Sequence, residues 1–136
     1  MKDILWIIGS KSDEAQIEPG IELMTEKAMD YDLKILSAHR DLPELTRLLD
    51  SREKEYRVII TAAGLSAALP GVVAAMTTRP VIGIPLVAGQ LAGMDALLSI
   101  LQLPKGIPCA TMGIGKQGVL NAVHLAERII KLAKSE

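Results

Sequence analysis

Short apolar runs alternate with amphipathic stretches along the whole chain. Continuous aliphatic runs predict buried strands, and apolar residues spaced three or four positions apart predict helices. Strands are expected at residues 4–8, 33–36, 57–61, 80–84 and 109–112, and helices at 12–29, 43–51, 69–77, 94–103 and 118–134. This alternation, with its short connections, predicts an α/β fold. We expect a three-layer αβα sandwich with a central parallel sheet in flavodoxin-like order.

Pro19 and Gly20 interrupt the first helical stretch. Proline is tolerated in the first turn of a helix but disrupts it further in. If the helix starts at Ser12, Pro19 lies too deep, so we expect either a kink or a late start near Glu18.

The length of 136 residues fits one domain, residues 1–136. A net charge of −1 and the scarcity of aromatic residues argue against a nucleic-acid partner. The one cysteine, Cys109, excludes an internal disulfide. No signal peptide is evident and no apolar stretch is long enough to span a membrane, so we expect a cytoplasmic protein. Apolar residues make up 49% of this short chain, which favours a homo-oligomer.

Three polar or glycine-rich turns follow predicted strands, at residues 9–13, 37–40 and 64–68. In a parallel sheet the carboxyl ends of the strands share one edge, and ligands bind there. In the first turn, Gly9 permits a tight bend, and Ser10, Ser12 and Asp13 are good capping residues. Such a turn either binds a phosphate or simply caps the helix. We expect the three turns to converge on one pocket.

His39 is the candidate for proton transfer because an imidazole both takes and gives a proton near neutral pH. The adjacent Arg40 suits a phosphate or carboxylate. The alternatives are a structural, hydrogen-bonded histidine and a solvated surface arginine.

Other chemistry has weaker support in the sequence. The loop around Ser66, followed later by Asp95 and His124, has the residue order of an α/β-hydrolase triad, but Ala68 stands where that motif needs glycine. No cluster of Cys, His and carboxylates has metal-ligand spacing, so we expect no metal site.

Several sequence blocks resemble the PurE family, which comprises the N5-carboxyaminoimidazole ribonucleotide mutases and aminoimidazole ribonucleotide carboxylases of purine biosynthesis. They are GSKSD (9–13), SAHR (37–40), ALPGVVAAMT (68–77), RPVIGIP (79–85), GMDALLSILQLPKGIPCAT (93–111) and NA (121–122). The resemblance extends from Ile7 to about Ile130, with the blocks in the family's order.

The resemblance implies a mutase in which the carboxylate on the exocyclic nitrogen is lost as CO₂ and added again at ring carbon C4. His39 matches the family's catalytic histidine and moves the proton that leaves C4. Ser10, Asp13 and Arg40 match substrate-binding positions. The complete set of expected substrate-binding residues is Gly9, Ser10, Ser12, Asp13, Ser37, Arg40, Gly64 and Ser66. The chemistry needs no metal or cofactor, its partners are the aminoimidazole ribonucleotide and CO₂, and the family is commonly a homo-octamer.

The third turn departs from the family's mutase loop, which reads roughly GAGGAAHLPG. Here Leu65 replaces a glycine and Ala68 stands where that loop has a second histidine. Gly64, Ser66 and Leu69 match the loop of the carboxylases that use free CO₂, whereas SAHR matches the mutases. A free-CO₂ carboxylase and a non-catalytic nucleotide-binding homologue therefore remain alternatives.

Overall fold

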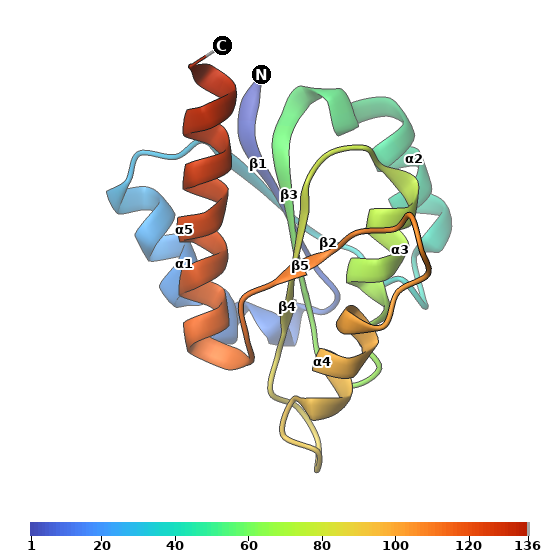
Figure 1. Cartoon of the computed structure of the whole chain (residues 1–136). Helices are drawn as coiled ribbons and strands as arrows, with labels where there is room; N and C mark the ends of the chain where they lie inside the picture. Colours follow the sequence, from blue (N-terminus) through green and yellow to red (C-terminus); the bar gives the residue numbers. More distant parts are fainter. Residues whose placement is uncertain (136) are drawn as a thin grey trace.

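Five parallel strands form one sheet in the order β2-β1-β3-β4-β5, seen in the computed structural model of Figure 1, which describes residues 1–135. The strands are β1 (Lys2–Ile8), β2 (Tyr31–Ile35), β3 (Tyr56–Ala63), β4 (Val81–Pro85) and β5 (Ala110–Thr111). This is the flavodoxin-like order, so the predicted fold class is confirmed.

Helices cover both faces of the sheet, which gives the three predicted layers (Figure 1). One layer holds α1 (Glu14–Glu26) and α5 (Gly115–Lys134). The other holds α2 (Leu42–Arg52), α3 (Ala68–Met76) and α4 (Met94–Leu101). No helix within residues 1–135 is both long enough and apolar enough to cross a bilayer.

The inner strand β1, which lies between β2 and β3, supplies side chains to both apolar cores. Ile4, Trp6 and Ile8 face the α1 and α5 layer, whereas Leu5 and Ile7 face the other one. All five side chains are fully buried. Because successive side chains of a strand point to opposite faces, a continuous apolar run is what a strand covered on both sides requires.

Of the two expectations for the first helix, a kink or a late start near Glu18, the late start is wrong. A 3-10 turn at Lys11–Asp13 leads directly into α1 at Glu14, and Pro19 lies inside the helix. The reason is tertiary packing: a Cβ atom on Gly20 would lie only 2.7 Å from both Trp6 and Val119. Glycine at this position allows the helix to approach the sheet and α5 closely, and this packing outweighs the backbone hydrogen bond that Pro19 removes.

The last helix begins at Gly115, three residues before the predicted start. The chain bends back there, so that a Cβ atom on Gly118 would lie 1.9 Å from the Gly113 carbonyl oxygen. Glycine at position 118 thus allows a tight entry into the helix. The preceding strand β5 has only two residues, which pair with Ile82 and Gly83.

Candidate functional site

A cavity of about 480 Å³ lies where β1, β2 and β3 end, and the three predicted turns all line it. Its lining includes all nine residues predicted for the site, namely Gly9, Ser10, Ser12, Asp13, Ser37, His39, Arg40, Gly64 and Ser66. The predicted convergence of His39 with the Ser10 turn is therefore present in the fold.

Strand register brings the turns to the same edge of the sheet. Ile8, the last residue of β1, pairs with Ile35 of β2 and with Ala62 of β3. The pairing continues into the turns, because the Gly9 N–H donates to the Ala62 carbonyl at 3.2 Å and the Leu36 N–H donates to the Ile8 carbonyl at 2.9 Å. The first and second turns thus leave the sheet at the same level.

The first turn presents two hydroxyl groups to the cavity. Ser10 has extended backbone geometry, and its Oγ accepts a hydrogen bond from the Ser12 N–H at 3.3 Å. The Ser10 and Ser12 hydroxyl oxygens lie 2.9 Å apart and share a hydrogen bond. This is the capping arrangement that the sequence indicated, with the hydroxyls on the side of the cavity.

Asp13 places a carboxyl group at the same wall. Partial burial raises the pKa of this carboxyl group above its usual value, and a hydrogen bond with the Ser10 backbone partly offsets that rise. None of the ion pairs found within residues 1–135 involves Asp13. Beyond its hydrogen bond with the Ser10 backbone, the carboxyl group can accept hydrogen bonds from a bound molecule.

Hydrogen bonds within the second turn hold His39 and Arg40 at its tip. The Ser37 Oγ accepts from the N–H groups of His39 and Arg40, at 3.2 Å each. The Asp41 carboxylate in turn accepts from the Ser37 N–H at 2.9 Å. Because the side chains of Ser37 and Asp41 fix the backbone, the imidazole and the guanidinium are exposed yet anchored at the cavity.

The third turn contributes small residues and one strained residue. A Cβ atom on Gly64 would lie 2.9 Å from the Cβ of Ala88, so the turn packs tightly against the β4–α4 loop. Leu65 has a φ of +56°, a left-handed conformation that glycine adopts without penalty. Helix α3 then begins at Ala68 without a side-chain cap, and Ala68 and Leu69 of its first turn line the cavity.

Six further residues line the cavity and were not predicted for the site: Ala38, Ala63, Leu65, Ala68, Leu69 and Ala88. They are small or aliphatic, so no chemical signal in the sequence marks them. Five of them lie within or beside the predicted turns. Ala88 comes from the loop after β4, and only tertiary structure reveals its contribution.

The hydrolase alternative is wrong. Ser66 lines the cavity, but Asp95 and His124 do not. Ser66 precedes α3, whereas His124 is exposed on α5, in the layer on the opposite side of the sheet. The three residues therefore cannot form a relay.

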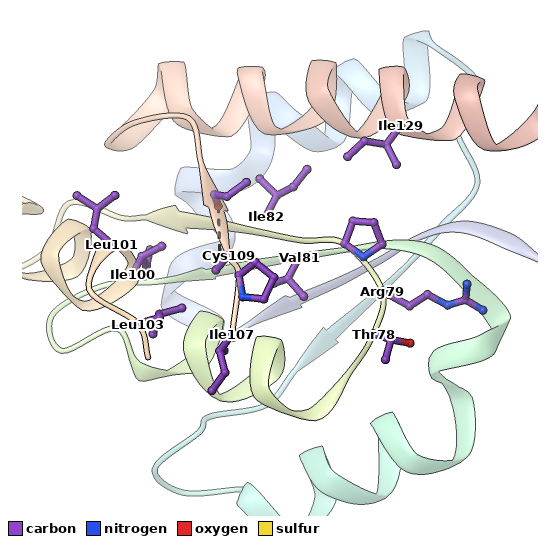
Figure 2. Close-up of a pocket in the computed structure, with 13 residues that line it drawn as sticks. Thr78, Arg79, Val81, Ile82, Ile100, Leu101, Leu103, Ile107, Cys109 and Ile129 are labelled. Carbon is purple, nitrogen blue, oxygen red and sulfur yellow. Dashed lines mark hydrogen bonds between the residues drawn. The ribbon is translucent and has the colours of Figure 1, made fainter. Parts of the chain in front are cut away.

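A larger hollow, of about 610 Å³, lies at the start of β4 beside the edge strand β5 (Figure 2). Its labelled walls are mainly aliphatic, with Arg79 and Thr78 at one end and Cys109 beside Val81. Burial raises the pKa of the Cys109 thiol to about 11, which favours the protonated thiol at neutral pH. The smaller cavity is the better candidate because it combines hydroxyl, carboxyl, imidazole and guanidinium groups.

The fold and this cavity define a flavodoxin-like α/β protein with a polar cavity at the carboxyl ends of its strands. A family model described as AIR carboxylase matches residues 3–136. The chain belongs to this family.

Relatives in several organisms are similar to the chain over most of its length. The N5-carboxyaminoimidazole ribonucleotide mutase of Bacillus subtilis is 44% identical over 125 residues, which are 91% of this chain and 77% of that protein. The enzyme of the same name in Haemophilus influenzae is 42% identical, over 91% of this chain and 76% of that protein. The one in Saccharolobus solfataricus is 40% identical over the full chain and 85% of that protein.

Two crystal structures from Treponema denticola have the same fold. The structure of a PurE2 variant that carries one substitution has a TM-score of 0.84 and 30% identity, over 97% of this chain and 82% of that chain. The structure of PurE has a TM-score of 0.78 and 26% identity, over 97% of this chain and 89% of that chain.

The left-handed conformation of Leu65 predicts an unusual order of stability among variants. Leu65→Gly should unfold with a free energy about 1 kcal/mol higher than Leu65→Ala, because only the alanine retains the Cβ penalty. Leu91 is a matched control, since it is also exposed and its φ is not positive. There the alanine variant should be the more stable. Urea unfolding of the four variants measures both orders, and the same order at both positions would contradict the prediction.

The raised pKa of Asp13 predicts a pH-dependent difference between the wild type and Asp13→Asn. A carboxyl group with a raised pKa binds its proton more tightly in the folded than in the unfolded state. Its contribution to the unfolding free energy is therefore greatest below the unfolded pKa of about 3.9 and is lost as pH rises through the folded pKa. The unfolding free energy of Asp13→Asn relative to that of the wild type should therefore rise as the pH passes from the unfolded to the folded pKa, and should stay constant at higher pH. Urea unfolding between pH 4 and 7.5 measures the difference, and a gap that narrows with rising pH would refute it.

Proposed function

We propose that the protein is an enzyme of purine biosynthesis that converts N5-carboxyaminoimidazole ribonucleotide into 4-carboxyaminoimidazole ribonucleotide. The observation that carries this proposal is the single cavity shared by His39 and the Ser10 turn. It is supported by relatives that are 40–44% identical and are named N5-carboxyaminoimidazole ribonucleotide mutase.

The substrate's phosphate and ribose would bind at the first two turns. The Ser10 and Ser12 hydroxyls can donate to phosphate oxygens, and Arg40 supplies the positive charge. The Asp13 carboxylate is a hydrogen-bond acceptor, which suits the ribose hydroxyls rather than the phosphate. The base is then directed towards the third turn and His39.

His39 would act as the general acid and base. Loss of CO₂ breaks the N–C bond and leaves an electron pair on the exocyclic nitrogen, which takes a proton. Ring carbon C4 then forms a bond to the carbon of CO₂, and C4 gives up its own proton. One proton is added and one is removed, so a single imidazole can perform both transfers.

The small residues of the third turn would hold CO₂ close to C4 between the two steps. Gly64 packs against Ala88, and Ala63, Ala68 and Leu69 complete an apolar wall. Such an apolar wall would exclude water and keep CO₂ inside the cavity.

We propose that the protein assembles as a homo-octamer. Large apolar side chains are exposed near the cavity. Leu65 lies in the third turn, Leu91 in the β4–α4 loop, and Met94, Leu98 and Leu101 lie on α4. These residues are 49–62% exposed, and contacts between copies would bury them.

An assay of both possible substrates tests the proposed reaction. The mutase converts the N5-carboxylated nucleotide without added bicarbonate. A carboxylase converts the uncarboxylated nucleotide only when bicarbonate or CO₂ is supplied, and Ala68, in place of the mutase loop's histidine, favours this second candidate. Turnover of only the uncarboxylated nucleotide would replace the first proposal with the second, and turnover of neither would indicate a nucleotide-binding protein.

Replacement of His39 by asparagine should separate catalysis from binding. The amide keeps polar character at the tip of the turn but cannot transfer a proton, so kcat should fall by about 10²–10⁴-fold. The dissociation constant of the nucleotide should change little. His124→Asn makes the same change at an exposed position of α5, outside the cavity, and should keep full activity. Retention of turnover by His39→Asn would remove this residue from the mechanism.

A further inference from the structure

The loop between β4 and α4 forms one wall of the cavity, although no residue of it was predicted for the site. It spans residues 86–93 and extends past the carboxyl ends of the strands (Figure 1). Ala88 lines the cavity, and a Cβ atom on Gly64 would lie 2.9 Å from the Ala88 Cβ. A Cβ atom on Gly89 would likewise lie 2.8 Å from the Leu65 side chain. The loop thus closes directly onto the third turn.

One end of this loop is fixed to the sheet, and the other is packed against the residue that precedes α5. The Leu86 N–H donates to the Ala63 carbonyl at 3.0 Å, which continues the pairing of β4 with β3. At the other end, Gly93 is buried with a φ of +91°, and a Cβ atom there would lie 2.6 Å from Ile114. Between these points the backbone of Val87 leaves the sheet, and this residue is 47% exposed.

One side chain from α1 holds the loop at that point. The Gln16 Nε2 donates to the Val87 carbonyl at 2.9 Å, and the Val87 N–H donates to the Gln16 Oε1 at 3.0 Å. The carboxamide therefore pairs with both backbone groups of Val87, as a neighbouring strand would. Only an amide side chain offers a donor and an acceptor side by side in this way at neutral pH.

We propose that Gln16 is a positioning residue for the cavity. It fastens the 86–93 loop to the helix that follows the Ser10 turn, and so sets the distance between the phosphate side of the cavity and the apolar wall where Ala88 packs against Gly64. This inference rests on the proposed function, because the wall it holds is the one that retains CO₂ during turnover.

Gln16→Met is the decisive variant. Methionine has a similar length and helix propensity but lacks both polar atoms, so the helix should fold while the loop is released. Gln102→Met is the matched control, since it makes the same change at an exposed residue at the far end of α4. With N5-carboxyaminoimidazole ribonucleotide labelled in its carboxylate carbon, Gln16→Met should lower kcat about tenfold. It should also raise the fraction of label lost to unlabelled bicarbonate several-fold. Nucleotide affinity should stay within about twofold of the wild type, and Gln102→Met should match the wild type in each measurement.

A second readout does not depend on turnover. Amide hydrogen exchange of the free protein should accelerate in Gln16→Met both in residues 86–93 and, across the contact, in residues 62–66. Faster exchange at Val87 alone, with wild-type kinetics and label retention, would overturn the inference and leave Gln16 a local contact. Equal losses of nucleotide affinity and thermal stability, with kcat unchanged, would also overturn it. If the wild type converts neither substrate, the proposed reaction fails, and the exchange at residues 62–66 still decides whether Gln16 holds the wall.

Discussion

The register between β1 and β3 is the constraint on which the site depends. Both strands are buried on both faces, so a slip of one residue would turn Trp6 and Ile8 away from the core that they fill. The register places Ile8 opposite Ala62, and the backbone of Gly9 still pairs with the carbonyl of Ala62. Apolar packing therefore places the first turn, on the phosphate side of the proposed site, and the third turn, on its CO₂ side, at the same level of the sheet. The polar residues of the site are not needed for this alignment.

This dependence explains why so much of the site follows from the sequence. The aliphatic run of β1 and the abrupt change at Gly9 mark a buried strand and its end, and the same signal recurs at Ser37 and Gly64. Parallel topology then requires these ends to meet at one edge of the sheet. The chemistry of His39 and Ser10 is not what brings these residues near each other, since the topology of the sheet brings their two turns together.

The features that the sequence does not reveal arise from contacts between distant segments. Pro19 looks like a break in a helix, because the close approach of Gly20 to Trp6 and Val119 is invisible in the local pattern. Gln16 and Val87 are 71 positions apart, and neither belongs to a motif. Ala88 is one alanine among many, and only its contact with Gly64 gives it a place in the cavity. The features that could not be predicted are those that depend on packing between distant residues and not on the chemical character of a local segment.

The charged groups at the two edges of the sheet differ in how they are paired. At the amino edge, Asp32 accepts hydrogen bonds from Lys2, at 2.7 Å, and from Tyr56, and the bond from Lys2 is the main reason that its pKa is lowered. At the carboxyl edge, Asp13 and Arg40 take part in no ion pair within the described part of the chain. Two features of this edge cost folding free energy: the partial burial of the Asp13 carboxylate, which raises its pKa, and the left-handed backbone of Leu65. This difference is expected if the ion pairs of the amino edge stabilise the fold, whereas the charged groups of the carboxyl edge bind a polar ligand.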